Sequence, residues 1–366
     1  MPVKVIGMIG VTPPAGDATV HVIEGGVSPE YLVEFSRAHE DAGFDLVLVG
    51  YTATSADGWE VATHAAAHTT TLGYLIAHRP GFVAPTLTAR KAATFDQLTR
   101  GRFALHVIAG VSDAEQQRDG DFTDKEVRYR RASEYLAVMR AVWAGERPVD
   151  FDGEFYRVAG ARSDVLPYQR PAPPVFFGGS SEAALVMGAE HCDVYAMFGE
   201  PRAAIAERVA DFRQRAERFG RRPRFSISFR PILGQTEGEA WDRARRILAQ
   251  IEAANGGVGP TLHRATDHSG ERMLGHAAAA DVHDERLWMK IAEATGAVGN
   301  TSCLVGTAEQ VADALLRYYE LGEGDIEYFL VRGFDPLADA RQFGEELVPR
   351  VKAGAAAIDA RLGQPA

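Results

Sequence analysis

The residues best suited to hold a ligand are Gly178-Gly179-Ser180-Ser181, which lie between the apolar residues 175–177 and a helical run from Glu182. A strand that enters a helix through such a turn presents unpaired backbone N–H groups and two hydroxyls at the helix N-terminus. This arrangement favours a phosphate group. The same residues also suit an ordinary strand–helix turn in which Ser180 or Ser181 caps the helix. The surrounding elements must decide between the two interpretations.

Composition narrows the class of protein. The chain has 366 residues, and its net charge of −11 argues against a nucleic-acid partner, which requires a positive surface. Cys192 and Cys303 both lie in apolar, strand-like stretches, so we expect two buried thiols and neither a disulfide nor a cysteine zinc site. The first ten residues read as a strand, and no apolar run reaches membrane-spanning length. We therefore expect a cytoplasmic protein without a membrane partner.

Strands and helices alternate along nearly the whole chain. Two stretches interrupt the alternation: residues 147–170 contain a hairpin signal around Asp152-Gly153, and residues 254–299 are rich in Gly, Ala and His. The expected strands are residues 3–10, 44–49, 72–77, 102–109, 175–177, 193–198, 225–233 and 326–332.

Eight strand–helix units predict a single-domain (β/α)8 TIM barrel over residues 1–366, with the two interruptions as insertions. A doubly wound sheet would be expected to carry Gly-x-Gly-x-x-Gly after its first strand, and the chain has no such motif there. The second insertion, after the seventh unit, is long enough to predict a mobile loop that closes over a site.

In such a barrel the chemistry lies at the C-terminal ends of the strands. Arg79 lies at one of these ends, and we expect it to bridge a neighbouring carboxylate and not to act on a substrate. The strand ends to consider are residues 50–57, 78–82, 106–112, 178–181, 228–230 and 332–335.

Several of these stretches together resemble the bacterial luciferase-like flavin monooxygenases, and most closely the alkanesulfonate monooxygenase branch. The resemblance extends from Val3 to about Pro349. It rests on SADGW, AHRPGFVAPTLTARKAATFDQLTRGR, HVIAG followed by RDGDF, Arg128-Tyr129, FFGGSSEAA and RGFDPL. It implies a TIM barrel that binds reduced FMN, which a separate NAD(P)H:flavin reductase supplies, and that uses O2. It also implies a homodimer or homotetramer.

The resemblance places the cofactor on particular residues. The FMN phosphate would lie on Gly179, Ser180 and Ser181, with Tyr129 reaching across from the preceding helix. The flavin ring would lie against Ala77, with His106 directed toward it and the Ala109-Gly110 turn beneath it.

The chain departs from the alkanesulfonate branch at its recognised site positions. An active-site Cys is replaced by Ser55, an Arg-x-His pair by Ser228 and Arg230, and a Tyr by Phe334. The Arg of the family's mobile insertion is also lost, and its position corresponds to about Ala297. Arg230, His78, Ser55 and Ser228 are the candidate catalytic residues, and Trp59, Phe82 and Phe334 are the candidate substrate-binding walls.

Three functions remain open. The first is a two-component FMN-dependent monooxygenase acting on a small organic substrate, such as a sulfonate or sulfone with C–S cleavage. The second is an F420-dependent dehydrogenase, and the third is a non-catalytic flavin-binding protein of the same fold. We expect no metal site, because the spacing of His263, His268, His276 and His283 matches no metal-binding motif. Arg264 and Arg272 could reach the phosphate or an anionic substrate.

Overall fold

Eight parallel strands form a closed barrel in the computed structural model, which describes residues 2–23, 25–110, 112–254, 268–297 and 299–363. The ring closes because β13 pairs with both β1 and β9, and β9 pairs with β8. The predicted TIM barrel is therefore confirmed. Its strands are β1 (Lys4–Met8), β2 (Leu46–Val49), β3 (Gly73–His78), β4 (Phe103–Val107), β7 (Val175–Phe177), β8 (Val194–Phe198), β9 (Arg224–Leu233) and β13 (Ile326–Val331).

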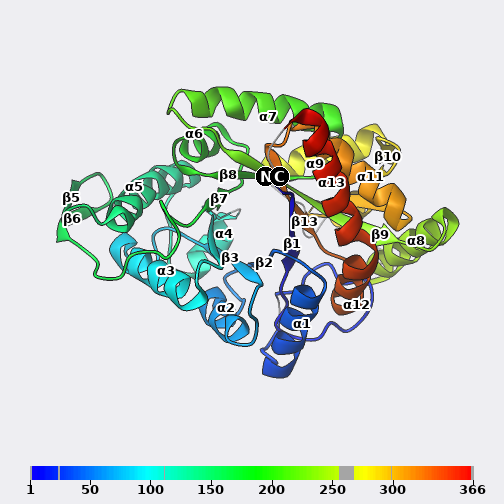
Figure 1. The fold of residues 1–366 in the computed structure, drawn as a ribbon, viewed down its shortest axis with the longest axis horizontal. Coiled ribbons are helices and arrows are strands. Elements are labelled where there is room, and N and C mark those ends of the chain that lie inside the picture. The colour runs from blue at the N-terminus through cyan, green and yellow to red at the C-terminus, as the bar shows by residue number, and fades with distance from the viewer. Residues whose placement is uncertain (1, 24, 111, 255–267, 298, 364–366) are drawn as a thin grey trace.

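Helices surround the barrel (Figure 1). Sequence signals fix several of their starts: Ser28 caps the first helix by accepting from Tyr31 N, with Pro29 as the first helical residue. The C-terminal helical segment is divided into α12 and α13 by a π-helical turn at Phe343–Leu347. The helices are α1 (Pro29–Asp41), α2 (Gly58–Ala66), α3 (Pro85–Thr99), α5 (Lys125–Ala144), α6 (Glu182–His191), α7 (Arg202–Glu217), α8 (Glu237–Ala254), α11 (Ala308–Leu321), α12 (Pro336–Gln342) and α13 (Val348–Leu362).

The barrel interior is a small apolar cluster distinct from the layer beneath the helices. Successive strand side chains point to opposite faces, so every second residue faces inward. The inward residues are Ile6, Leu75, Ala104, Phe176, Val194, Tyr328 and Leu330. Two residues further along their strands, Ala77, His106 and Arg332 therefore face the C-terminal mouth of the barrel.

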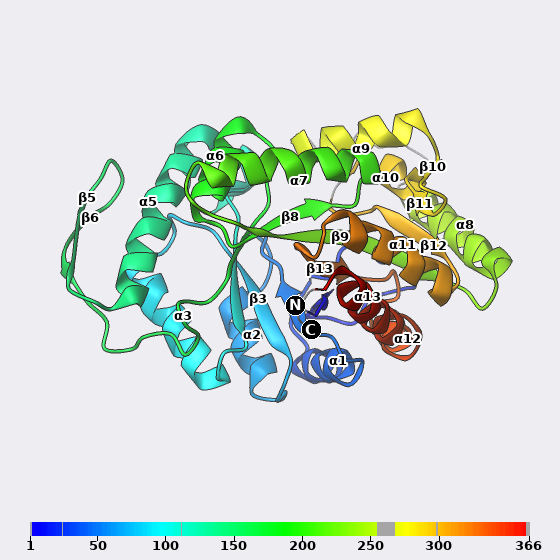
Figure 2. The ribbon, with the colours of Figure 1, turned by 45° about the horizontal axis from the view of Figure 1, so that its top comes forward.

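The first insertion is a hairpin, as predicted, formed by β5 (Val149–Asp152) and β6 (Arg157–Ala161). The second insertion is built on β9, whose last residues, from Arg230, pair with β12 (Cys303–Gly306). Strands β11 (Leu287–Trp288) and β10 (Val282–His283) continue this extension, and helices α9 (His268–Ala279) and α10 (Lys290–Ala294) accompany it. Figures 1 and 2 show the two insertions at opposite ends of the long axis of the molecule.

The prediction of one long loop is wrong for residues 268–294, which form helices and short strands, while closure over a site stays a prediction. Helix α9 packs there through Met273 and Ala277, which are 0% and 5% exposed, and its Arg272 pairs with a buried carboxylate of the barrel. Residues 255–267, which include His263 and Arg264, lie outside the described residues.

Both cysteine thiols are buried, as expected, and burial raises the pKa of the Cys303 thiol to about 12. Ala62, Ala65 and Ala66 of α2 are also buried within the chain. In the part of the chain that the structure describes, no helix combines the length and the apolar character needed to cross a bilayer.

Candidate active site at the barrel mouth

The Gly-Gly-Ser-Ser turn lies where β7 ends and α6 begins. Ser181 is the N-cap of α6 and accepts a hydrogen bond from Ala184 N at 3.4 Å, so the capping interpretation is correct for Ser181. Ser180 is not used as a cap: its Oγ lies 3.0 Å from Ser269 Oγ, near the start of α9. All four residues of the turn are partly exposed, which leaves room for a ligand at the positive end of α6.

Glycine at 179 is required by packing. A Cβ there would lie 3.0 Å from the ring of Phe177 and 2.9 Å from Ala184 Cβ. Tyr129 of α5, 7% exposed, packs edge-on against the same Phe177 ring at 6.1 Å between centroids. The structure therefore places the Tyr129 ring against the strand residue that precedes the turn, while its contact with a phosphate stays a prediction.

His106 of β4 is the clearest unsatisfied polar group in the mouth. It lies between Ala77 of β3 and Phe176 of β7 in the strand register. Its Nδ1 is buried and has no hydrogen-bond partner among the described residues. Burial lowers the pKa of the imidazole to about 4, so the ring is neutral at pH 7. A buried polar atom without a partner destabilises the free protein, and a ligand that forms a hydrogen bond with it offsets this cost.

A short helix, α4 (Asp113–Arg118), covers this side of the mouth. Its Gln116 is 1% exposed and lies against Gly110, where an added Cβ would be 1.8 Å from the Gln116 amide nitrogen. Gly110 also has a φ of +82°, which favours glycine. The Ala109 carbonyl in turn accepts from Arg128 Nε at 2.8 Å. The Ala109-Gly110 turn is thus held by protein contacts that the sequence did not reveal.

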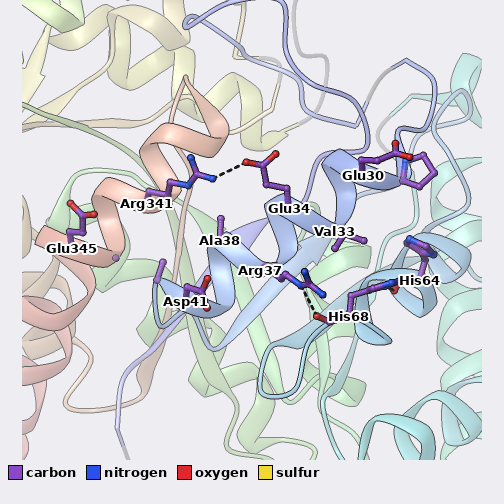
Figure 3. Close-up of a pocket in the computed structure, with 13 residues that line it drawn as sticks. Glu30, Val33, Glu34, Arg37, Ala38, Asp41, His64, His68, Arg341 and Glu345 are labelled. Atoms are coloured by element: carbon purple, nitrogen blue, oxygen red, sulfur yellow. Dashed lines mark hydrogen bonds and ion pairs between the residues drawn. The ribbon is translucent and has the colours of Figure 1, made fainter.

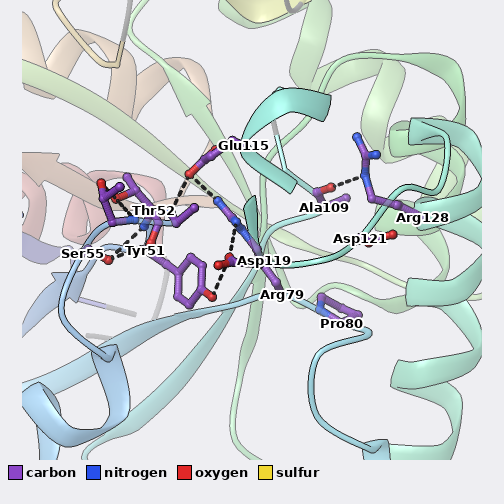
Figure 4. A network of polar contacts seen from close by, with 12 residues as sticks. Tyr51, Thr52, Ser55, Arg79, Pro80, Ala109, Glu115, Asp119, Asp121 and Arg128 are labelled. Carbon is purple, nitrogen blue, oxygen red and sulfur yellow. Dashed lines mark hydrogen bonds and ion pairs between the residues drawn. The ribbon is translucent and has the colours of Figure 1, made fainter. Parts of the chain in front are cut away.

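Arg79 anchors α4 to the barrel (Figure 4). Its Nη2 lies 2.6 Å from Glu115 Oε1 and its Nη1 lies 3.2 Å from Asp119 Oδ2, while the guanidinium covers the ring of Tyr51. The predicted carboxylate bridge is confirmed. Ser55 lies in the neighbouring turn, where its Oγ accepts from Thr52 N at 3.0 Å and donates to the Thr52 carbonyl at 3.1 Å.

His78 faces the helix layer and not the mouth. Its Nε2 lies 2.7 Å from the Tyr135 hydroxyl, which in turn bonds Thr88 Oγ1 at 2.5 Å. Burial, followed by the nearby charge of Lys91, lowers its pKa to about 4. Because Ala77 faces inward, His78 must face outward, and this placement favours a packing role over proton transfer to a substrate in the mouth.

Two of the expected substrate walls also lie away from the mouth. Trp59, 6% exposed, packs against His78, Phe95 and Phe103 beneath the helices. Phe334 is fully buried in the cluster that supports the β9–β12 extension. Phe82 is partly exposed in the loop after β3. The first two placements favour support of the barrel wall over contact with a substrate.

Arg230 is fully buried and holds three loops together. Its Nε donates to the Asn300 carbonyl at 2.9 Å and its Nη2 to the Val20 carbonyl. Its Nη1 donates to the Thr19 carbonyl at 2.8 Å and to the Gly333 carbonyl at 3.4 Å. The guanidinium lies 4.5 Å above the centroid of the Phe334 ring. Arg230 thus organises the loops around the mouth.

Ser228 is next to this cluster. Its Oγ accepts from Asn300 Nδ2 at 2.5 Å. Sequence reasoning missed Asn300 and Arg332, although Arg332 belongs to the RGFDPL motif at the end of the last strand. Arg332 donates to the Asn300 and Val20 carbonyls at 3.1 and 3.3 Å. The structure therefore assembles two arginines, Ser228 and Asn300 on one side of the mouth.

A second charged cluster follows β8. Glu200 is 0% exposed and lies 2.6 Å from both Arg208 of α7 and Arg272 of α9. Burial alone would raise the pKa of Glu200, but hydrogen bonds from His276 and Arg272 and the charge of Arg208 lower it to about 2. Arg272 is therefore engaged with Glu200 and not directed at the Gly-Gly-Ser-Ser turn.

A groove of about 810 Å³ lies elsewhere, on the outer wall between α1, α2 and α12 (Figure 3). Arg341 and Glu34 form an ion pair across it at 2.8 Å, and Arg37 donates to the His68 carbonyl at 3.3 Å. The groove contains no residue from a strand end. The barrel mouth, which gathers the polar groups described above, remains the candidate site.

Comparison with protein families gives one match, to a model described as luciferase-like monooxygenase, over residues 8–323. This range includes β2 to β9, the Gly-Gly-Ser-Ser turn and α11, and stops before β13.

Solved structures share the fold over nearly the full chain. EDTA monooxygenase (EmoA) from Chelativorans sp. BNC1 is 19% identical with a TM-score of 0.75, covering 100% of this chain and 99% of that one. Long-chain alkane monooxygenase (LadA) is 19% identical with a TM-score of 0.74, covering 96% and 92%. An F420-dependent secondary alcohol dehydrogenase is 18% identical with a TM-score of 0.68, covering 96% and 99%.

Proposed function

The chain belongs to the luciferase-like monooxygenase family, and from this premise we propose that it is an FMN-dependent monooxygenase using reduced FMN and O2 on a small organic substrate. The observation that carries the proposal is the pairing, on adjacent strands, of the Gly-Gly-Ser-Ser turn after β7 with the unsatisfied Nδ1 of His106 on β4. The turn suits a phosphate, and the orphaned nitrogen suits a polar edge of a ring.

The side chains and backbone amides at the mouth are of the kinds that bind the phosphate and the ring of FMN. Ser180, Ser181 and the first amides of α6 would hold the phosphate, with Tyr129 beside them. Ala77 and His106 would contact the flavin ring, and the small Ala77 side chain leaves space for a flat group. When bound, reduced FMN supplies the two electrons with which O2 is activated.

The chain's own contribution is positioning and exclusion of water. His106 is neutral at pH 7, so it can offer either a nitrogen lone pair or an N–H without adding charge to the mouth. Helix α4, anchored by Arg79 and closed over Gly110 by Gln116, shields the same side of the mouth from solvent. On the other side of the mouth, Arg230 holds the loops that contain Val20 and Asn300, and Ser228 contacts Asn300.

The substrate class follows from the resemblance and stays part of the proposal: an organosulfur compound such as a sulfonate or sulfone. A separate NAD(P)H:flavin reductase would supply reduced FMN, and the chain would work as a homodimer or homotetramer. EDTA monooxygenase and long-chain alkane monooxygenase, whose names describe other substrates, share the fold, so the fold does not select the substrate.

An F420-dependent dehydrogenase is the second candidate, supported by the likeness to the F420-dependent alcohol dehydrogenase. Anaerobic titration of the purified chain with reduced FMN and, separately, with reduced F420 separates the two, followed by addition of O2 and absorbance spectroscopy. Binding of reduced FMN with an altered rate of its oxidation supports the proposal. Binding of F420 alone replaces it, and FMN binding with unaltered oxidation and no product from sulfonates or sulfones indicates a non-catalytic flavin-binding protein.

One variant tests the phosphate site without removing the helix cap. Ser180→Ala deletes a hydroxyl that does not cap α6 but keeps the capping Ser181, so we expect FMN affinity to fall about 10-fold or more, as for one hydrogen bond to a charged group. Ser163→Ala, in the segment between β6 and β7, is the control and should leave FMN affinity unchanged. Equal affinities for the wild type and Ser180→Ala would place the phosphate elsewhere.

A further inference from the structure

Two guanidinium groups lie together on the wall of the mouth formed by β9, β13 and β1. Arg332 follows the inward-facing Leu330 by two residues, so its side chain enters the mouth. Arg230 and Arg332 share two acceptors, the carbonyls of Asn300 and Val20. Sharing both acceptors places the two cations side by side.

No carboxylate forms an ion pair with either arginine in the part of the chain that the structure describes; the charge of Asp339 acts on Arg230, but this carboxylate is itself paired with Arg243. Both arginines donate to backbone carbonyls; Arg332 also contacts Met8 Sδ at 3.3 Å, and Arg230 lies over the Phe334 ring. Burial, followed by the charge of Arg332, lowers the pKa of Arg230, and burial lowers the pKa of Arg332 to about 10. Two neighbouring cations, one fully and one partly buried, that form no ion pair repel each other and favour a bound anion.

The two arginines differ in what they can still bind. Arg230 is fully buried, and all three of its guanidinium nitrogens donate to carbonyls. Arg332 is partly exposed, and its described contacts use only Nη1 and Nη2, so Nε–H keeps its donor capacity. A guanidinium with free N–H groups beside a second cation suits the two oxygens of a carboxylate or sulfonate.

The position of this wall separates it from the cofactor residues. The barrel order is β1, β2, β3, β4, β7, β8, β9 and β13, so β13 lies opposite β4, which carries His106. An anionic group on Arg332 would therefore face the residues assigned to the flavin ring from across the mouth. Ser228, which accepts from Asn300, is on the same wall and could contact the neutral part of the same molecule.

We propose that Arg332 is the anion-recognition residue of the site and binds a carboxylate or sulfonate group of the substrate, while Arg230 adds charge and fixes the loops. This proposal rests on the proposed function, because it assumes that the opposite wall is occupied by the flavin. It narrows the substrate to an organic anion.

Fluorine NMR on the purified, flavin-free chain tests the proposal with defined probes. Trifluoroacetate and trifluoromethanesulfonate represent the anions, and trifluoroacetamide is the neutral control of similar size. We expect the wild type to bind the anions at least about 10-fold more tightly than the amide, and Arg332→Gln to weaken only the anions by about 10-fold or more. Arg341→Gln removes an exposed arginine of the outer groove and should change neither affinity.

Two further measurements keep the outcome decisive. If Arg332→Gln does not fold, Arg332→Lys keeps the charge without the planar fork and should lose part of the anion affinity. Wild-type binding that is equal for anions and amide would overturn the proposal, as would unchanged anion binding in a folded Arg332→Gln. FMN affinity is measured in parallel: a change there with unaltered anion preference would assign Arg332 to the cofactor and refute its substrate role. If the wild type does not bind FMN, the proposed function is refuted, and the result for the anions then shows only whether Arg332 binds an anion.

Discussion

Two buried charge clusters at neighbouring strand ends differ in how their charge is balanced. After β8, the carboxylate of Glu200 is enclosed by Arg208, Arg272 and His276, each from a helix outside the barrel strands. On β9 and directly after β13, Arg230 and Arg332 donate to backbone carbonyls and form no ion pair with a carboxylate of the described residues. The first cluster carries its own counter-charges, whereas the second remains positive.

This difference separates a structural cluster from a candidate binding site. A buried ion that is already paired has little to gain from a ligand, and its partners join three parts of the chain: the end of β8, α7 and α9. A cluster of one sign costs free energy in the free protein, and a bound ion of the opposite sign recovers that cost. Whether a buried charge has a paired opposite charge thus distinguishes residues that stabilise the fold from candidate ligand-binding residues.

The largest expected effect is on the balanced cluster. Glu200→Gln leaves Arg208 and Arg272 without their carboxylate, so we expect the free energy of unfolding to fall by about 4 kcal/mol. Urea denaturation measures this loss. Glu271→Gln, at an exposed carboxylate of α9 that lies 3.5 Å from His268, is the control and should cost well under about 1 kcal/mol. A loss below about 1 kcal/mol for Glu200→Gln would show that the cluster does not hold the fold.

The second prediction concerns pH. The folded pKa of Glu200 is about 2, below the ordinary 4.5, so the stability from its ionised form is complete above pH 4.5 and is lost as the pH falls toward 2. The total is roughly 3 kcal/mol, from about 1.4 kcal/mol per pKa unit. The difference in unfolding free energy between the wild type and Glu200→Gln should therefore narrow between pH 4.5 and 3. A constant difference over this range would contradict the assigned pKa.

A smaller effect is expected in the unbalanced cluster. Arg230→Met leaves several carbonyls without a donor but also removes a buried cation and its repulsion with Arg332, so these terms partly cancel. We expect a loss of about 2 kcal/mol in urea denaturation, half that of Glu200→Gln. A larger loss of unfolding free energy for Arg230→Met than for Glu200→Gln would show that the carbonyl contacts compensate the charge of Arg230 fully. The two clusters would then not differ in charge balance.

The smallest effect concerns His106, a neutral buried group in the same mouth. His106→Leu removes an unsatisfied nitrogen, so we expect the free protein to gain about 1 kcal/mol of stability while FMN affinity falls about 5-fold. His106→Asn restores a polar group and should recover much of the affinity. Fluorescence quenching of FMN and thermal denaturation measure the two quantities. Lower stability with unchanged FMN affinity would make His106 a structural residue.

Much of the fold was predictable from the sequence, because alternation, caps and turn residues act locally. The eight strands and the hairpin around Asp152-Gly153 follow from apolar runs and turn signals, and both are confirmed. The helices and strands within residues 254–299 were not predictable from the sequence. Helix α9 has few local signals and is held by Glu200, which lies 72 residues from Arg272 in the chain.

The candidate site was predictable only in part. The turn around Ser180 and the ion pairs of Arg79 follow from residue type and position at a strand end. The directions of Ala77 and His78 do not, because β3 is buried on both faces and its sequence shows no polar alternation to indicate the inward side. A shift of one residue in the inward-facing register exchanges the two faces of a strand. The prediction that His78 faces the mouth is therefore wrong, because His78 lies in the helix layer.

The sequence by itself determined the barrel, its order of elements and the Gly-Gly-Ser-Ser turn, because these depend on neighbours a few residues apart. Only the tertiary structure decided which charges are balanced. Arg230 meets Val20 from 210 residues away, and Arg332 enters the mouth beside it through the register of β13. Charge balance depends on all groups within a few ångströms, whatever their distance along the chain, and folding alone brings those groups together.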